Sequence, residues 1–90
     1  MERAQILVKG YVQRVAFRAY IKEKAKTLKL VGYVRNLSDG NVEIMAEGEK
    51  EGLEELIQWS HNGSPVSTVK EVIGTFSEAT GEFKSFEITY

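Results

Sequence analysis

The chain has 90 residues, of which 42% are hydrophobic and 28% are charged, and it contains no cysteine. These values are ordinary for a globular domain and exclude collagen-like, disordered and disulfide-stapled classes. No apolar run approaches the roughly 18 residues that a membrane span needs, and the N-terminus shows no secretory signal. The sequence therefore predicts one cytoplasmic domain over residues 1–90, with no disulfide, thiolate metal site or cysteine nucleophile.

Charge is divided unevenly between the two halves of the chain. Residues 1–38 carry nine Lys or Arg against two acids, a balance of +7. Residues 39–90 carry three Lys against eleven acids, a balance of −8. Such asymmetry is typical of a chain whose first half meets an anionic partner. Two solvated faces of opposite sign that attract each other explain it equally well.

Apolar residues that alternate or recur at helical spacing predict seven elements. In the first helix, for example, the apolar positions 17, 20, 21, 25 and 28 lie on one side and lysines on the other. The residues Ser38–Asn41 have the composition of a hairpin turn. In chain order we expect a strand Gln5–Val12, a helix Phe17–Leu28, strands Leu30–Leu37 and Asn41–Glu47, a helix from about Glu49 to Asn62, and strands Val66–Phe76 and Phe83–Tyr90.

This order, βαββαβ with an added C-terminal strand, consists of two split βαβ halves. It predicts a ferredoxin-like α+β sandwich, in which an antiparallel sheet carries both helices on one face. In a right-handed split βαβ unit the first two strands run parallel, with the third between them. Their C-terminal ends then share one edge of the sheet, about 10 Å apart.

The junction between the first strand and the first helix is a predicted anion site. The helix that begins near Phe17 has no Ser, Thr, Asp or Asn at its N-cap, so its first N–H groups need another acceptor. A bound phosphate supplies one, and so does water. Arg18 in the first turn opposes the helix dipole. Either bidentate binding of a phosphate or an ion pair with the acidic half explains that placement.

Two segments carry a resemblance to a known family. Gly10–Arg18 (GYVQRVAFR) and Gly32–Gly40 (GYVRNLSDG) resemble the two signatures of the acylphosphatase family, G-x-V-Q-G-V-x-F-R and G-x-V-x-N-x-x-D-G. That family has a ferredoxin-like fold, as the element order predicts. The resemblance continues over essentially the whole chain, through Val42-Glu43, Glu47-Gly48, Trp59, Gly63–Pro65 and Phe86–Ile88.

The resemblance implies hydrolysis of acyl phosphates to a carboxylate and inorganic phosphate. It implies that Arg18 binds the phosphate and that Asn36 positions the attacking water. The partners are then a small-molecule acyl phosphate and inorganic phosphate, and we expect a monomer that binds neither nucleic acid nor membrane. The amides that cradle the phosphate are implied to be those of Gln13, Arg14, Val15, Ala16 and Phe17.

The implied chemistry needs little from the protein. A carboxylate is a good leaving group, so no general acid is required, and phosphoryl transfer depends on positioning and charge stabilisation. One arginine and several amides supply both, so we expect no metal and no cofactor. Asn36 does not ionise at neutral pH, so we assign it orientation only and expect a phosphate oxygen to accept the proton of the water.

Two alternatives remain open at this point. Arg14 stands where the family signature has glycine, and if that position needs a positive φ it stores about 1–3 kcal/mol of strain. A catalytically weak or inactive phosphate-binding member is therefore the first alternative. The second is an RNA-binding module of the same topology, although the strand Asn41–Glu47 has no aromatic residue to stack a base and carries two acids. His61 and Trp59 are predicted to be a surface residue and a packing residue, respectively.

Overall fold

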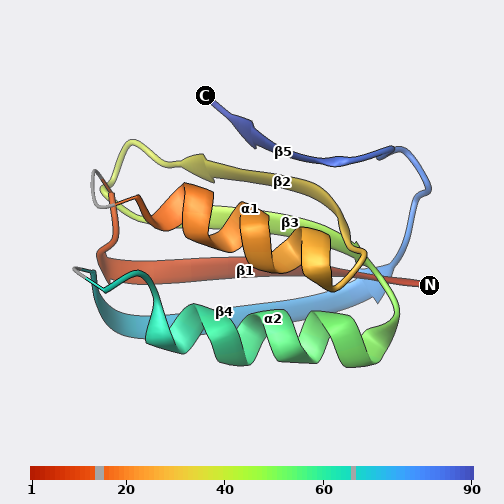
Figure 1. The fold of residues 1–90 in the computed structure, drawn as a ribbon, viewed down its shortest axis with the longest axis horizontal. Coiled ribbons are helices and arrows are strands. Elements are labelled where there is room, and N and C mark those ends of the chain that lie inside the picture. Colours follow the sequence, from red (N-terminus) through yellow and green to blue (C-terminus); the bar gives the residue numbers. More distant parts are fainter. Residues whose placement is uncertain (14–15, 66) are drawn as a thin grey trace.

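Within residues 1–13, 16–65 and 67–90, which the computed structural model describes, the chain forms seven elements in the predicted order. The first strand begins earlier than predicted because its N-terminal residues pair on both sides, Glu2 with Gly48 and with Glu78. Neither helix has the length and apolar character that crossing a bilayer demands. The elements are β1 (Glu2–Tyr11), α1 (Phe17–Thr27), β2 (Val31–Asn36), β3 (Val42–Gly48), α2 (Lys50–Asn62), β4 (Thr68–Glu78) and β5 (Phe86–Thr89) (Figure 1).

The sheet has the order β4-β1-β3-β2-β5, and both helices cover one of its faces (Figure 1). Strands β1 and β2 are each antiparallel to β3, so they run parallel to each other with β3 between them, as predicted. The prediction of an all-antiparallel sheet is wrong for β5, which pairs in parallel with β2. The last residues of β4 and the first residues of β2 lie at the same end of the sheet. The chain crosses to β5 at that end, so β5 starts beside the start of β2 and runs in the same direction.

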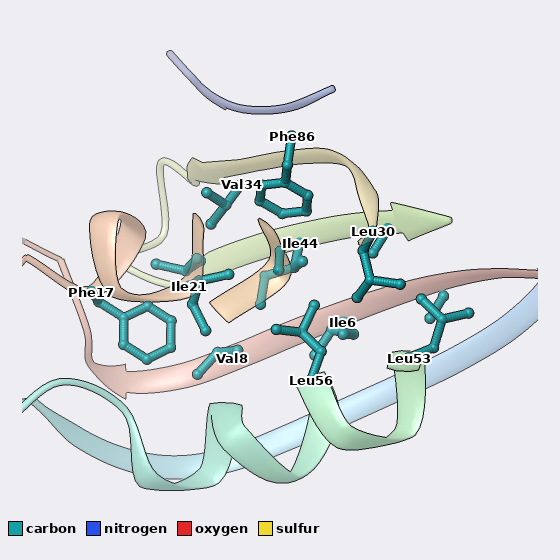
Figure 2. Packing of buried hydrophobic residues seen from close by; sticks show 14 of the residues in the cluster. Ile6, Val8, Phe17, Ile21, Leu30, Val34, Ile44, Leu53, Leu56 and Phe86 are labelled. Carbon is teal, nitrogen blue, oxygen red and sulfur yellow. The ribbon is translucent and has the colours of Figure 1, made fainter. Parts of the chain in front are cut away.

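The core lies between the sheet and the two helices (Figure 2). It contains the alternating residues of β1 and β3 and the helix residues Phe17, Ile21, Ala25, Leu53 and Leu56, all at most 3% exposed. Two residues of the predicted stripe of α1, Tyr20 and Leu28, are only partly buried. Each fully buried Leu, Ile or Phe side chain contributes roughly 1.5–3 kcal/mol. This packing fixes the start of α1 over the C-terminal end of β1. The largest members are Ile6, Phe17, Ile21, Ile44, Leu53 and Leu56.

The first glycine of each signature is required by close backbone packing. Gly10 has φ 134°, and a Cβ atom there would lie 2.1 Å from the carbonyl oxygen of Thr68. Gly32 has φ 142°, and a Cβ atom would lie 1.8 Å from the carbonyl oxygen of Met45. Both distances are far below van der Waals contact, so these two positions accept only glycine. The glycines of the signatures therefore shape the strands that lead into the site.

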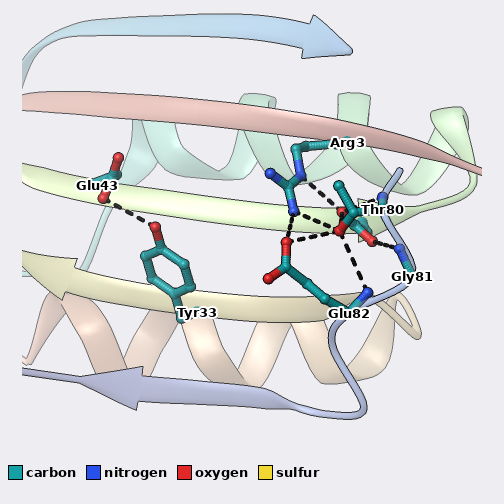
Figure 3. A network of polar contacts seen from close by, with 7 residues as sticks. Arg3, Tyr33, Glu43, Thr80, Gly81 and Glu82 are labelled. Atoms are coloured by element: carbon teal, nitrogen blue, oxygen red, sulfur yellow. Dashed lines mark hydrogen bonds and ion pairs between the residues drawn. The ribbon is translucent and has the colours of Figure 1, made fainter. Parts of the chain in front are cut away.

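The face of the sheet away from the helices buries two carboxylates, Glu43 and Glu47, which are 6% and 2% exposed. Glu47 accepts hydrogen bonds from Arg3 Nε at 2.8 Å and from the backbone N–H groups of Thr80 and Gly81 at 2.9 and 3.1 Å (Figure 3). Burial alone raises the pKa of Glu47, but these hydrogen bonds outweigh it and hold the pKa below its ordinary value. The connection from β4 to β5 is thus fastened to β3.

Glu43 has a similar set of donors on the same face. It accepts hydrogen bonds from Gln5 Nε2 at 2.7 Å, from Arg35 Nε at 2.7 Å and from the Tyr33 hydroxyl at 3.4 Å. Burial raises its pKa, and the bonds from Gln5 and Arg35 lower it further than burial raises it. The two acids that the alternation of β3 places opposite the core are therefore structural groups in satisfied networks.

Candidate active site

The C-terminal ends of β1 and β2 lie at one edge of the sheet. Val42 of β3 is paired with Val8 on one side and with Asn36 on the other, so Asn36 lies two strands across from Val8. Two strand spacings correspond to about 10 Å. The chain leaves β1 three residues after Val8, at Tyr11, and enters the predicted phosphate loop. The topology therefore brings the loop and Asn36 to the same edge, as predicted.

Gln13 ties the loop to the turn that follows β2. Its Nε2 atom donates to the carbonyl oxygens of Leu37 and Asn41, both at 2.8 Å. The turn itself is closed by the Leu37 N–H, which donates to the carbonyl of Asn41 at 2.8 Å, and Gly40 has φ 92°. The sequence reasoning assigned only the amide of Gln13 and missed this role of its side chain. No local pattern signals it, because the two partners lie 24 and 28 residues away.

Helix α1 begins without a side-chain cap, as the sequence predicts. Its N-cap residue is Ala16, which has a left-handed conformation with φ 60° and ψ 18°. The first helical hydrogen bond runs from the Tyr20 N–H to the Ala16 carbonyl at 3.1 Å. The N–H groups of Phe17 and its neighbours in the first turn therefore have no acceptor within the helix. They lie at the positive end of the helix dipole, which attracts an anion.

Arg18 extends from the first turn of α1 to the end of β5. Its Nη1 atom donates to the carbonyl oxygen of Thr89 at 3.5 Å, and its Cζ atom lies 4.9 Å from the centre of the Tyr90 ring. Thr89 is paired with Arg35, the residue before Asn36. Arg18 is therefore anchored beside the end of β2. Among residues 1–13, 16–65 and 67–90, Arg18 forms no ion pair with a carboxylate, unlike Arg3 and Arg35.

A pocket of about 150 Å³ lies against Arg18. It is formed where the end of β1, the start of α1 and the end of the chain meet, and it is large enough for a tetrahedral anion. The pocket is lined by Val12, Ala16, Phe17, Arg18, Ala19, Ile88 and Tyr90.

Asn36 is half-buried at the end of β2, and its Oδ1 atom is fully buried. In the part of the chain that the structure describes, this oxygen has no hydrogen-bond donor. A buried acceptor without a donor costs roughly 1–3 kcal/mol. Most buried polar atoms of natural proteins are hydrogen-bonded, so this exception singles out Asn36 among the residues at the end of β2.

The family model described as Acylphosphatase matches residues 4–88. The chain belongs to the acylphosphatase family. It is 46% identical over 90 residues to an acylphosphatase of Marinobacter nauticus, with 100% of this chain and 98% of the relative covered. It is also 46% identical over 89 residues to an acylphosphatase of Aeropyrum pernix, covering 98% of this chain and 88% of the relative. The crystal structure of acylphosphatase from Bacillus subtilis superposes on it with a TM-score of 0.96, 39% identity and full coverage of both chains.

The site residues expected for this acylphosphatase fall into two groups. Gln13, Ala16, Phe17, Arg18 and Asn36 all lie at the shared edge. The predicted cradle residues Arg14 and Val15 lie outside the described residues. The contact of Arg18 with the last two residues of the sequence, Thr89 and Tyr90, was not foreseen, since it depends on which strand β5 pairs with.

The remaining candidates are structural residues. His61 is exposed at the end of α2, where its Nδ1 atom lies 3.0 Å from the Ile57 carbonyl, as expected for a surface residue there. Trp59 is half-buried and packs against Tyr20 with the ring centres 5.2 Å apart. In the described ranges no three His, Asp or Glu side chains gather in a way that would hold a metal ion.

Proposed function

We propose that this acylphosphatase hydrolyses its acyl phosphate substrate in the pocket beside α1, with Arg18 holding the phosphate and Asn36 orienting the attacking water. The observation that carries the proposal is the position of Arg18. Its guanidinium lies beside the uncapped start of α1. Among the described residues it has no carboxylate partner and contacts only the Thr89 carbonyl, through one long hydrogen bond, and the ring of Tyr90.

Two kinds of donor would hold the phosphate. The first-turn N–H groups of α1 supply fixed dipoles that need no rearrangement when charge develops on the phosphoryl oxygens. The guanidinium of Arg18 supplies a planar pair of donors with a full charge. Gln13 keeps the loop against the turn after β2, and so sets the distance between these donors and Asn36. The family resemblance implies that the amides of Arg14 and Val15, which lie outside the described residues, would also donate to the phosphate.

In the reaction the water oxygen attacks phosphorus as the bond from phosphorus to the carboxylate oxygen breaks. The carboxylate leaves with the bonding electron pair, and a phosphoryl oxygen takes the proton that the water loses. Asn36 Oδ1 would accept a hydrogen bond from the water, which aims the lone pair of the water at phosphorus. Because Oδ1 is buried in the free protein, the Asn36 side chain must turn toward the bound phosphate for this hydrogen bond to form.

Hydrolysis of acetyl phosphate in the presence of a chelator tests the proposal. Because the donors are an arginine and amides, turnover should persist without a metal or cofactor, and inorganic phosphate should inhibit competitively by occupying the same pocket. A chelator-sensitive activity that returns only with added magnesium would contradict this assignment. Competitive inhibition that persists in an Arg18→Ala variant would move the phosphate to another place.

We further propose that the 90-residue unit acts as a single domain and as a monomer in the cytoplasm. The residues that line the pocket come from one chain, so the site needs no second copy. Binding of nucleic acid is disfavoured because the open face of β3 carries the carboxylates of Glu43 and Glu47, and residues 79–85 are fastened over it. Light scattering after gel filtration tests the monomer, and a salt titration with single-stranded RNA tests whether the protein binds nucleic acid.

A further inference from the structure

A larger groove lies next to the phosphate pocket, along the side of α1 that faces Trp59 of α2. Its volume is about 560 Å³, and its lining is mainly apolar. Tyr20, Glu23, Lys24 and Thr27 line it at the helical spacing of one face of α1. Trp59 packs on Tyr20 to form its aromatic wall.

The groove and the phosphate pocket meet at two alanines. Ala16 and Ala19 line both hollows, one on each side of the first turn of α1. Alanine has no side-chain atom beyond Cβ, so the divide between the hollows is low. Tyr20 lies four residues beyond Ala16, which is about 6 Å along the helix axis. A molecule held at the phosphate pocket therefore reaches the aromatic wall with only a few carbon atoms.

Lys24, which lines the groove, already has two partners. Lys24 Nζ lies 4.7 Å from the centre of the Trp59 ring and 3.1 Å from a carboxylate oxygen of Glu55. These contacts hold the lysine against the indole, so the aliphatic part of its side chain extends the apolar surface. The groove thus offers mainly apolar contact, and its carboxylate, Glu23, disfavours a second anionic group.

An acyl phosphate has two parts, a phosphate and an organic acyl group. With the phosphate against Arg18 and the first turn of α1, the acyl group points either into water or over Ala16 and Ala19. We propose that it crosses the alanines and lies in the groove, so that the enzyme prefers acyl phosphates with an apolar chain or ring to acetyl phosphate. This inference rests on the proposed function, because it assumes that the phosphate occupies the pocket of Arg18.

The acyl preference follows from contacts that only a longer acyl group makes. Each methylene that leaves water entirely is worth roughly a fourfold gain, and a groove open on one side gives about half of that free energy, or about twofold per methylene. Hexanoyl phosphate has four more methylenes than acetyl phosphate. We therefore expect kcat/KM for hexanoyl phosphate to exceed that for acetyl phosphate by on the order of tenfold.

The test compares acetyl, butanoyl and hexanoyl phosphates, whose straight-chain carboxylates leave with similar ease. The ratio of kcat/KM for hexanoyl to acetyl phosphate is measured within one protein sample, so it does not depend on how much of a variant is folded. Tyr20→Ala removes part of the wall and should lower the ratio severalfold, whereas Tyr20→Phe should keep it. Tyr33→Ala, on the opposite face of the sheet, is the matched control and should leave the ratio unchanged.

A flat acyl series in the wild type, or a ratio that Tyr20→Ala leaves intact, would overturn the inference while the proposed function stands. Failure to hydrolyse any of the three substrates would overturn the proposed function instead. In that case calorimetric binding of hexylphosphonate against methylphosphonate still decides the groove: tighter binding of the hexyl compound, lost in Tyr20→Ala, supports it, and equal binding overturns it.

Discussion

On the face of the sheet away from the helices, called the open face below, arginines form hydrogen bonds and ion pairs with buried carboxylates. At the C-terminal ends of β1 and β2, by contrast, an arginine and a carboxamide have no such partners in the described part of the chain. Glu47 receives donors from Arg3, Thr80 and Gly81. Among the described residues at the C-terminal ends of β1 and β2, Arg18 has one hydrogen bond of 3.5 Å and a contact with the Tyr90 ring, and the Asn36 oxygen has no donor. The difference distinguishes residues that stabilise the fold from residues that are proposed to bind the substrate and the water. Changes on the open face should cost stability, and changes at the edge should cost activity.

The largest effect should come from Arg18→Ala. Removing one aimed, charged donor to the phosphate should lower kcat/KM for acetyl phosphate by at least about 10²-fold. The urea midpoint should move little, because within the described residues the guanidinium makes one long hydrogen bond and one contact with the exposed ring of Tyr90. Steady-state kinetics and urea unfolding of the same preparation measure both quantities.

Arg3→Ala is the control for this prediction. It removes an arginine that is ion-paired to Glu47 on the open face, so it should lower stability and keep kcat/KM per folded molecule. If Arg18→Ala retained full activity, or if Arg3→Ala lost as much activity as Arg18→Ala, the division between the two regions would fail.

The next effect concerns Glu47, which is almost fully buried. Glu47→Gln keeps the shape but replaces an acceptor of several hydrogen bonds with a group that is half donor, so it should lower the free energy of unfolding at pH 7 by roughly 1–3 kcal/mol. Activity measured on the folded fraction should not change. Urea unfolding monitored by the fluorescence of Trp59 gives the value.

The pH dependence sharpens this prediction. The pKa of Glu47 in the folded protein is lower than its ordinary value of 4.5, so its contribution is present above that value. The contribution is lost as the pH falls from about 4.5 through the folded pKa, where the carboxylate takes up a proton in both states. The stability gap between the wild type and Glu47→Gln should therefore narrow as the pH falls below 4.5. A gap that stays constant would show that ionisation of Glu47 does not stabilise the fold.

A smaller effect should follow Asn36→Ala. Losing the group that orients the water should lower kcat by about tenfold, with KM for acetyl phosphate nearly unchanged, because Asn36 does not hold the phosphate. Stability should stay equal or rise slightly, since a buried acceptor without a donor is removed. An increase in KM with an unchanged kcat would instead place Asn36 on the phosphate.

The helices and strands can be predicted from the sequence because they depend on local patterns of apolar residues. The placement of the C-terminal ends of β1 and β2 side by side can be predicted because connections between parallel strands are right-handed. The alternation around Ile44 and the helical stripe of Phe17 and Ile21 each predict which face is buried. The direction of β5 does not follow, because it depends on where residues 79–85 cross the sheet. The burial of Glu47 does not follow either, since its partner Arg3 lies 44 residues away.

The candidate site divides in the same way. The uncapped start of α1 and the unfavourable place of Arg18 beside the helix dipole are visible in the sequence. The roles of Arg18 and Asn36 come from the family signatures, and no residue pattern alone assigns them. The side chain of Gln13 shows its purpose only in the folded chain, where it meets Leu37 and Asn41.

The double hydrogen bond of Gln13 has a consequence for how this enzyme can vary. The side-chain amide of Gln13, which follows β1, is hydrogen-bonded to both sides of the hairpin turn after β2, although the two segments are distant in sequence. Lengthening the hairpin would pull both carbonyls out of reach and release the loop at the same time. Chimeras between homologues should therefore fold and function best when the hairpin after β2 and the loop after β1 come from the same parent.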